Sequence, residues 1–172
     1  MGVYIPDDFL DKNIRRIIEV EHNNPLTPDE IGKLISLKIS FDGESNVKRL
    51  DGLQYAVNLE SLDLSDSEVS DISVLTQLPK ISGGEAKLNK IFIGRANLNS
   101  LIFSEGFSNL EYLEAQDNAI SYVVGIEHLS SIKKSKTLSL NNSKSNKPIS
   151  FDEAEVWDFT VNGKKYKARR YS

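Results

Sequence analysis

The stretch NLESLDLSDSEVSDISVLTQL, residues 58–78, has an uneven spacing of apolar side chains. These side chains belong to Leu59, Leu62, Leu64, Val69, Ile72, Leu75 and Leu78. The successive steps are 3, 2, 5, 3, 3 and 3 residues. A strand would give steps of 2 throughout, and a helix would mix steps of 3 and 4. The spacing therefore predicts a short strand followed by a tight return segment of a different conformation.

The same spacing recurs along the chain, in copies that begin at residues 34, 59, 88, 110 and 135. The copy at 110, LEYLEAQDNAISYVVGIEHL, repeats the offsets of residues 59–78. The period of 22 to 29 residues lies in the range of leucine-rich repeats. Two leucines two residues apart place both side chains on one face of a short strand. The later steps of 3 suit a helical or 3₁₀ return, and stacked coils then share one continuous core.

The array is imperfect at the turn that follows each predicted strand, where Asn is the residue best suited to satisfy backbone groups. The residues at this position are Asp42, Ser67, Ala96, Asn118 and Ser143. Ser and Asp can also bond to nearby backbone, but Ala96 cannot. We expect residues 79–87, PKISGGEAK, to bulge as a loop and residues 102–109, IFSEGFSN, to form an irregular return.

The N-terminal segment, residues 1–33, reads as a helical cap for the open end of the array. Helical spacing relates Phe9, Leu10, Ile14, Ile17 and Ile18, with acidic residues in the first turn. A second helix is expected to begin with a capping box made of Thr27, Pro28 and Glu30. The inner face of this helix is predicted to contain Ile31, Leu34 and Ile35.

The C-terminal segment, residues 146–172, changes character after the polar stretch SKSNKP. Asn162-Gly163 between VWDFTV and KKYKARRY predicts a β-hairpin with Trp157, Phe159 and Val161 on one face of its first arm. The whole pattern predicts an α/β fold. The predicted architecture is a short leucine-rich-repeat solenoid of about five coils, residues 34–145, with a parallel concave sheet. A helical cap is expected at its N-terminal end and a β-hairpin cap at its C-terminal end.

Composition argues against several classes of function. The chain has no Cys and only two His, so disulfides, thiol catalysis and cysteine-ligated zinc are excluded, and we expect no metal and no cofactor. No phosphate-binding loop, nucleophile elbow or HExxH motif occurs, so we predict no catalytic residue and no enzyme. Residues 1–158 carry 16 basic and 25 acidic residues, which argues against nucleic acid as a partner.

The sequence has no apolar run of 18 residues, and its N-terminus lacks the basic and apolar regions of a signal peptide. We therefore expect no membrane span. Two compartments stay open: secreted or cell-surface if a leader has been removed, and cytoplasmic otherwise. The five basic residues after position 158 are interpreted either as lysine protection of an edge strand or as a contact with an acidic partner or anionic lipid.

The segments IPDDFLDKNIRRII, LTPDEIGKLISLKIS and VKRLDGLQYAVNLESLDLSDSEVSDISVLTQL resemble the cap and first repeats of internalin-like leucine-rich-repeat proteins of Gram-positive bacteria. The resemblance implies a helical cap, a curved array and binding of other proteins on the concave sheet. It also implies a secreted or wall-attached protein, since many members are, and the best known bind host receptors. The chain departs from the family in having few repeats, no Asn ladder, and a hairpin where an immunoglobulin-like domain is expected.

The intervening positions of LxxLxLx point away from the core and form the predicted partner-binding surface. Its predicted residues are Lys38, Glu60, Asp63, Lys90, Phe92, Tyr112, Glu114 and Gln116. Phe92 and Tyr112 fall on neighbouring strands, where their rings could meet as an anchor for a monomeric binding module. The acidic residues around them, together with Glu111, favour a protein partner with a basic rim and an apolar knob.

Two alternatives to partner binding remain open. In the first alternative, the chain is a structural spacer of a larger bacterial surface protein. Phe92 then packs under residues 79–87, and the acidic residues only aid solubility. An enzymatic function would instead require a deep polar pocket around Asp152, Glu153, Glu155 and Lys164.

Overall fold

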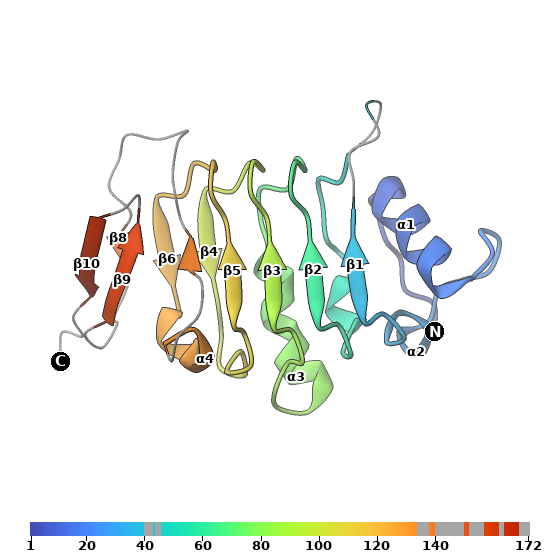
Figure 1. Ribbon diagram of the computed structural model, residues 1–172. Helices are drawn as coiled ribbons and strands as arrows, with labels where there is room; N and C mark the ends of the chain where they lie inside the picture. Colours follow the sequence, from blue (N-terminus) through green and yellow to red (C-terminus); the bar gives the residue numbers. More distant parts are fainter. Residues whose placement is uncertain are drawn as a thin grey trace.

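In the computed structural model, the described residues are 1–39, 43, 46–133, 138–139, 150–151, 157–161 and 164–168. The chain runs as a row of stacked coils, with two N-terminal helices at one end and a C-terminal hairpin at the other (Figure 1). Each coil contributes one short strand to a common sheet, as the repeat spacing predicts.

A five-stranded parallel sheet runs along the array in the order β1-β2-β3-β5-β7. Its strands are β1 Ser36–Lys38, β2 Ser61–Asp63, β3 Lys90–Phe92, β5 Tyr112–Glu114 and β7 Leu138–Ser139. The register aligns the second apolar residue of each repeat, in the line Leu37, Leu62, Ile91, Leu113 and Leu138. The leucine-rich-repeat solenoid and its parallel sheet are therefore confirmed.

The return segments are more varied than the sequence predicts. Three of them contain 3₁₀ helices, η1 Leu53–Tyr55, η2 Ser73–Gln77 and η3 Ile126–His128. A short helix, α4 Ser130–Lys133, follows η3. Two returns begin with strands, β4 Ser100–Ile102 and, in the return that also contains η3, β6 Tyr122–Val124. These strands join β8 Ser150–Phe151 in a second parallel sheet of order β4-β6-β8. Aromatic and β-branched residues favour this extended conformation in the last two returns.

The segment 79–87, expected as a loop, is helical in its first half. Helix α3, Leu78–Ser82, continues directly from η2 and ends at Gly83, whose φ is 89°. Pro79 is tolerated there because it lies in the first turn, where the missing N–H has no helical partner. Beyond the helix, the amide of Ala86 donates to the carbonyl of Gly106 at 2.8 Å, so this part of the segment is held against the next return.

The core is a single cluster that runs through the stacked coils from the N-terminal helices to the last described return. Three polar residues are buried with it in the described part of the chain: Ser67, Ser100 and Asn118, of which Asn118 is fully buried. The amide of Asn118 donates to the carbonyls of Ile93 and Ala115 at 2.8 and 3.0 Å, and its Oδ1 accepts from the Leu98 amide at 3.0 Å. This residue performs the task predicted for Asn at the turn, and Ala96 is buried at the same position of the preceding repeat.

Helix α1, Asp8–Ile18, covers the first coil with Leu10 and Ile14, both fully buried. Ile17, predicted on the same face, is 39% exposed. Asp7 caps the helix by accepting from the Leu10 amide at 2.9 Å. The second oxygen of Asp7 accepts from the amides of Lys48 and Arg49 at 2.8 and 3.0 Å, which ties the helix to the first return segment.

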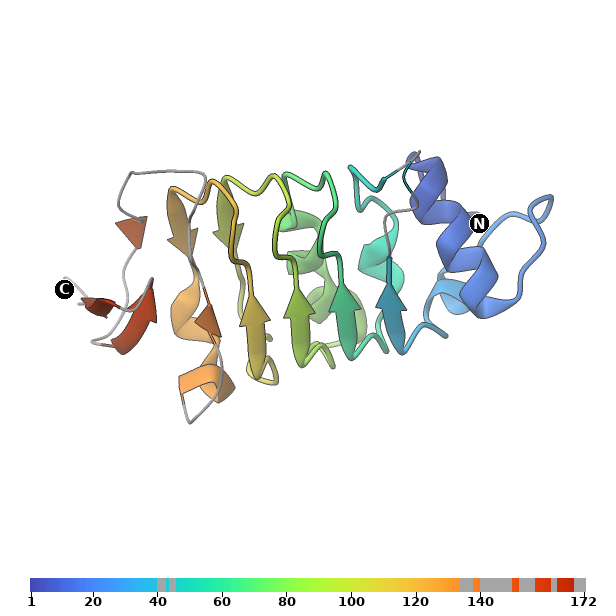
Figure 2. The same cartoon turned by 45° about the horizontal axis from the view of Figure 1, so that its top comes forward.

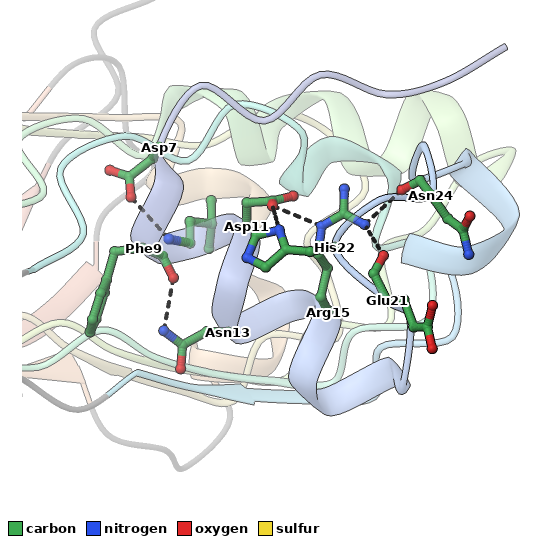
Figure 3. Close-up of polar contacts among 9 residues, drawn as sticks. Asp7, Phe9, Asp11, Asn13, Arg15, Glu21, His22 and Asn24 are labelled. Carbon is green, nitrogen blue, oxygen red and sulfur yellow. Dashed lines mark hydrogen bonds and ion pairs between the residues drawn. The ribbon is translucent and has the colours of Figure 1, made fainter.

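The chain that leaves α1 is held by Arg15 (Figure 3). Its Nε donates to Asp11 at 2.8 Å, and its Nη1 donates to the carbonyls of Glu21 and Asn24 at 2.9 and 2.7 Å. Nδ1 of His22 lies 3.8 Å from Asp11 Oδ2, so His22 and Arg15 both contact the same carboxylate of α1.

Helix α2, Pro28–Ile31, begins with the predicted capping box: Thr27 accepts from the Glu30 amide, and the Glu30 carboxylate accepts from the Thr27 amide. These hydrogen bonds, the one from the Thr27 backbone foremost, lower the pKa of Glu30 below its ordinary value. Leu34 is buried as predicted, but Ile35 is 51% exposed. The prediction fails for Ile35 because the helix ends at Ile31 and the chain has already turned toward β1.

The C-terminal hairpin is present, with β9 Trp157–Val161 antiparallel to β10 Lys164–Ala168. The register pairs Val161 with Lys164 at the closed end. The predicted turn residues, Asn162 and Gly163, lie outside the described residues, as do Asp42 and Ser143 of the repeat turns.

Candidate functional site

The outer face of the five-stranded sheet, which we call the sheet face, carries six of the eight predicted binding residues: Lys38, Asp63, Lys90, Phe92, Tyr112 and Glu114. Glu60 comes directly before β2, and Gln116 comes just beyond β5. The sheet face consists of the side chains that alternate with the buried line of Leu37, Leu62, Ile91 and Leu113. The register arranges them in two rows across the strands. The first row is Ser36, Ser61, Lys90 and Tyr112, and the second row is Lys38, Asp63, Phe92 and Glu114. The strands stand side by side on one surface in both views (Figures 1 and 2).

Two cations of the sheet face have partners on neighbouring strands. Lys38 Nζ lies 3.3 Å from Asp63 Oδ2, although 71% of the Lys38 side chain is exposed. Lys90 Nζ lies 5.8 Å from the centroid of the Tyr112 ring, within the range of a cation–π contact. Much of the positive charge on this face is therefore compensated inside the chain.

The acidic side chains are compensated less. Glu60 is exposed and Glu114 is half-buried. In the described part of the chain, neither carboxylate takes part in an ion pair. Unpaired negative charge therefore lies next to Phe92, at Glu114, and just before β2, at Glu60.

The two predicted aromatic anchors occupy different rows. Phe92 stands opposite Glu114, and Tyr112 stands opposite Lys90, so the rings are diagonal neighbours on adjacent strands. Phe92 is half-buried between Asp63 and Glu114. Helix α3, which begins the segment expected to cover Phe92, lies behind the sheet in Figure 2. Phe103 and Phe107 form an edge-to-face ring pair in the core, with centroids 5.7 Å apart.

Gln116 was predicted on this surface, but its contact with Gly94 was not. A Cβ added at Gly94 would lie 2.7 Å from Gln116 Nε2, so the amide of Gln116 rests directly over the glycine. Gln116 Oε1 is buried and accepts no hydrogen bond from the described residues. The contact joins residues 22 positions apart, and it follows only once the register of β3 and β5 is known.

The edge of the sheet beyond these strands carries a charged line that the sequence analysis missed. Asp66, Arg95 and Asp117 all have left-handed backbone, with φ of 63°, 55° and 58°. Arg95 donates to both carboxylate oxygens of Asp66, at 2.5 and 2.7 Å. These hydrogen bonds lower the pKa of the Asp66 carboxyl. The available signal was positional, since each residue comes two positions after the last apolar residue of its strand motif.

A polar hollow of about 480 Å³ lies between the first two return segments. Lys48, Arg49 and Asp71 are among its lining residues. Lys48 pairs with Glu68 at 3.2 Å and Arg49 with Asp51 at 2.9 Å, so the two basic side chains there are already paired. Asp71 accepts hydrogen bonds from the amide and the hydroxyl of Ser73. The pocket imagined for an enzyme, around Asp152, Glu153, Glu155 and the Lys164 side chain, lies outside the described residues.

The described part of the chain has neither a cluster of metal ligands nor a membrane-spanning helix. No group of three or more His, Asp or Glu side chains is placed to hold a metal ion. None of the helices found there combines the length and the apolar character needed to cross a bilayer.

The fold and the repeat register identify the chain as a leucine-rich-repeat protein with an internalin-like fold. The crystal structure of the internalin InlF from Listeria monocytogenes matches 83% of this chain at 25% sequence identity and a TM-score of 0.61. That match spans 38% of the InlF chain. The internalin C2 structure from the same organism matches 86% of this chain and 67% of its own, at 19% identity and a TM-score of 0.52, which is a likeness of fold. No protein-family model and no curated protein matches the sequence.

Proposed function

We propose that this chain is a non-catalytic protein-binding module that uses the sheet face to hold a protein partner. The single observation that carries the proposal is the placement of half-buried Phe92 and Tyr112 beside unpaired Glu114 on one side of a continuous parallel sheet. Half-buried aromatic side chains are frequent anchors of protein interfaces, because they supply contact area at a low entropic cost. Phe92 and Tyr112 are such side chains.

The organisation we propose follows from this function. Residues 1–33 cap the first coil, residues 34–145 present the sheet face, and residues 146–172 cap the last coil. Coils stacked in this way hold the side chains of different repeats in fixed positions. One copy of the chain therefore provides the whole binding surface, and we propose that it binds as a monomer. The negative charge of the face favours a partner with a basic rim.

The likeness to internalins supports a place at the bacterial surface and a partner outside the cell. The match spans 38% of the InlF chain, so the proposal concerns the repeat module alone. Nucleic acid is not the proposed partner, because the body of the chain is acidic.

A structural spacer is the second candidate function. The observation that favours it is the pairing of Lys38 with Asp63 and of Lys90 with Tyr112, which satisfies part of the sheet face without a partner. A spacer would capture no partner with the sheet face.

The test is capture of proteins by the immobilised chain from membrane and secreted fractions of foreign cells, beside a lysate of the source organism. The double variant Phe92→Ala/Tyr112→Ala should abolish capture and keep the thermal melt cooperative. Tyr122→Ala is the matched control, because Tyr122 is an exposed ring on β6 of the second sheet. Capture that survives the double variant would overturn the use of the sheet face.

A further inference from the structure

Phe92 lies between two carboxylates on the sheet face. The register places Asp63 opposite it on β2 and Glu114 opposite it on β5. Adjacent strands are about 4.8 Å apart, so the backbones of the two acids are about 10 Å apart with the ring between them. Asp63 is engaged by Lys38 at 3.3 Å and accepts from the Ser65 amide at 3.1 Å. The available negative charge next to the ring is therefore on the Glu114 side.

The same side holds a second acceptor without a donor. Gln116 lies two residues after Glu114, just beyond β5, and its amide crosses to Gly94, two residues after Phe92 and just beyond β3. Gln116 Oε1 is buried and has no hydrogen-bond partner among the described residues. A buried acceptor left unpaired costs free energy, and a donor from a partner would recover it. We call the group Phe92, Glu114 and Gln116 the cradle.

The chemistry of the cradle distinguishes between possible occupants. It combines one aromatic ring, one carboxylate and one amide oxygen, and the cations of the face are directed elsewhere: Lys38 to Asp63 and Lys90 to the Tyr112 ring. An apolar side chain over Phe92 would bury Glu114 and leave Gln116 Oε1 unpaired, which is unfavourable. A guanidinium stacks on a ring with its plane and donates through a fork of N–H groups at its edge. A lysine ammonium offers charge but lacks the planar fork.

We propose that the cradle receives an arginine side chain of the protein partner, stacked on Phe92 and donating to the Glu114 carboxylate and to Gln116 Oε1. This inference rests on the proposed function and names the group recognised at the centre of the same surface. A small rotation of the flexible Gln116 side chain presents Oε1 to the guanidinium. The partner contact is therefore a cation at Phe92, in place of the apolar knob expected from the sequence.

The experiment is an NMR titration of the full chain with N-acetyl-arginine N-methylamide, beside the lysine and norleucine analogues. The arginine probe should give saturable shifts at Phe92, Glu114 and the Gln116 side-chain amide. It should bind about tenfold tighter than the norleucine probe, in line with a charge-assisted hydrogen bond and a cation–π contact. Equal shifts with norleucine, or shifts that never saturate, would overturn the arginine cradle.

Matched variants test each part of the cradle. Phe92→Leu keeps an apolar side chain and removes the ring, and should weaken the arginine probe about fivefold. Glu114→Gln keeps the shape and removes the charge, and should weaken it about tenfold. Gln116→Leu should reduce the preference for arginine over lysine. The controls Tyr122→Leu and Glu105→Gln change an exposed ring and an exposed acid away from the cradle, and should leave the titration unchanged.

The titration tests the arginine cradle and the capture assay tests the use of the sheet face, so the two proposals can be overturned independently. Ser61→Trp places a bulky ring on β2 of the sheet face and should block capture of any partner held there. If Ser61→Trp removes capture while the arginine probe shows no saturable binding, the face binds a partner of other chemistry and the cradle is overturned. If the probe binds as expected and capture persists in Ser61→Trp, the cradle stands and the proposed use of the whole face fails.

Discussion

Arg95 and Asp66 join neighbouring coils through two hydrogen bonds, Nε to Oδ1 at 2.5 Å and Nη2 to Oδ2 at 2.7 Å. Both residues have left-handed backbone, with φ of 55° and 63°. This conformation is unfavourable for most side chains. The turn after each strand requires it, and the paired side chains extend from equivalent positions of adjacent coils. The pair therefore holds together two turns that are each locally strained.

The first prediction concerns the titration of Asp66. Hydrogen bonds from Arg95 lower the pKa of this carboxyl in the folded protein. The stabilisation from the pair is therefore complete above the unfolded pKa of about 3.9 and is lost as the pH falls through the lower folded pKa. Arg95→Gln should raise the pKa of Asp66 toward the ordinary value, as measured by carboxyl ¹³C shifts. An unchanged Asp66 titration would contradict the pairing.

The second prediction concerns Asn118. Asn118→Ala leaves the Leu98 amide and the carbonyls of Ile93 and Ala115 without their buried partner. We expect a loss of about 2–4 kcal/mol in the free energy of unfolding, measured by urea denaturation. The control is Ser67→Ala at the same position of another repeat, where Ser67 Oγ accepts one bond of 3.3 Å from the Val69 amide. A control that loses as much as Asn118→Ala would show that the position, and not the hydrogen-bond network, sets the cost.

The repeat spacing was sufficient for the sheet and its register, because two apolar residues separated by one position must share a face of a strand. Leu62, Ile91 and Leu113 align across β2, β3 and β5 as the offsets require. It was insufficient for the returns, since a strand of three residues such as β6 buries only one side chain, and apolar residues three positions apart supply that side chain as well as those of a 3₁₀ turn. The local preference of Tyr122–Val124 for extended backbone favours the strand in β6.

The sheet face could be predicted as a set of positions but not as a set of contacts. Lys90 and Tyr112 are 22 residues apart, and only the register brings the ammonium to 5.8 Å from the ring centroid. Gly94 reads in the sequence as one more outward position, whereas in the structure its missing side chain makes room for the Gln116 amide. Exposure of Ile17 and Ile35 was also beyond helical periodicity: Ile17 lies on α1 but is 39% exposed, and Ile35 lies after α2 has ended at Ile31.

The third prediction concerns the attachment of the N-terminal helix. Asp7 accepts from the Leu10 amide in α1 and from the amides of Lys48 and Arg49 in the first return. Asp7→Ala should reduce the free energy of unfolding by about 1–2 kcal/mol, the usual cost of a lost N-cap. Asp8→Ala, one residue later and exposed, should change it by about 0.5 kcal/mol or less. Equal losses in urea denaturation would mean that negative charge near the helix start, and not the cap geometry, provides the stability.

The fourth prediction contrasts two glycines. At Gly125, φ is 77° and an added Cβ would lie 2.1 Å from the carbonyl oxygen of Phe103, a backbone atom that cannot move aside. Gly125→Ala should therefore cost about 2–4 kcal/mol of unfolding free energy. At Gly94, φ is outside the left-handed region and the added Cβ meets only the end of the Gln116 side chain. Gly94→Ala should change stability by about 0.5 kcal/mol or less, because that side chain can rotate away.

The effects of the same two substitutions on binding should be the reverse of their effects on stability. The Cβ added in Gly94→Ala would occupy the place of the Gln116 amide and displace it further than the small rotation that presents Oε1 to the guanidinium. Gly94→Ala should therefore weaken the arginine probe in the NMR titration while the thermal melt stays close to that of the parent chain. Gly125 lies after β6, in the second sheet, so at temperatures where Gly125→Ala remains folded its titration should match the parent. A Gly94→Ala chain that binds the probe normally would show that the position of the Gln116 amide is irrelevant to recognition. A marked loss of stability in Gly94→Ala would show instead that the amide is fixed in place by its packing.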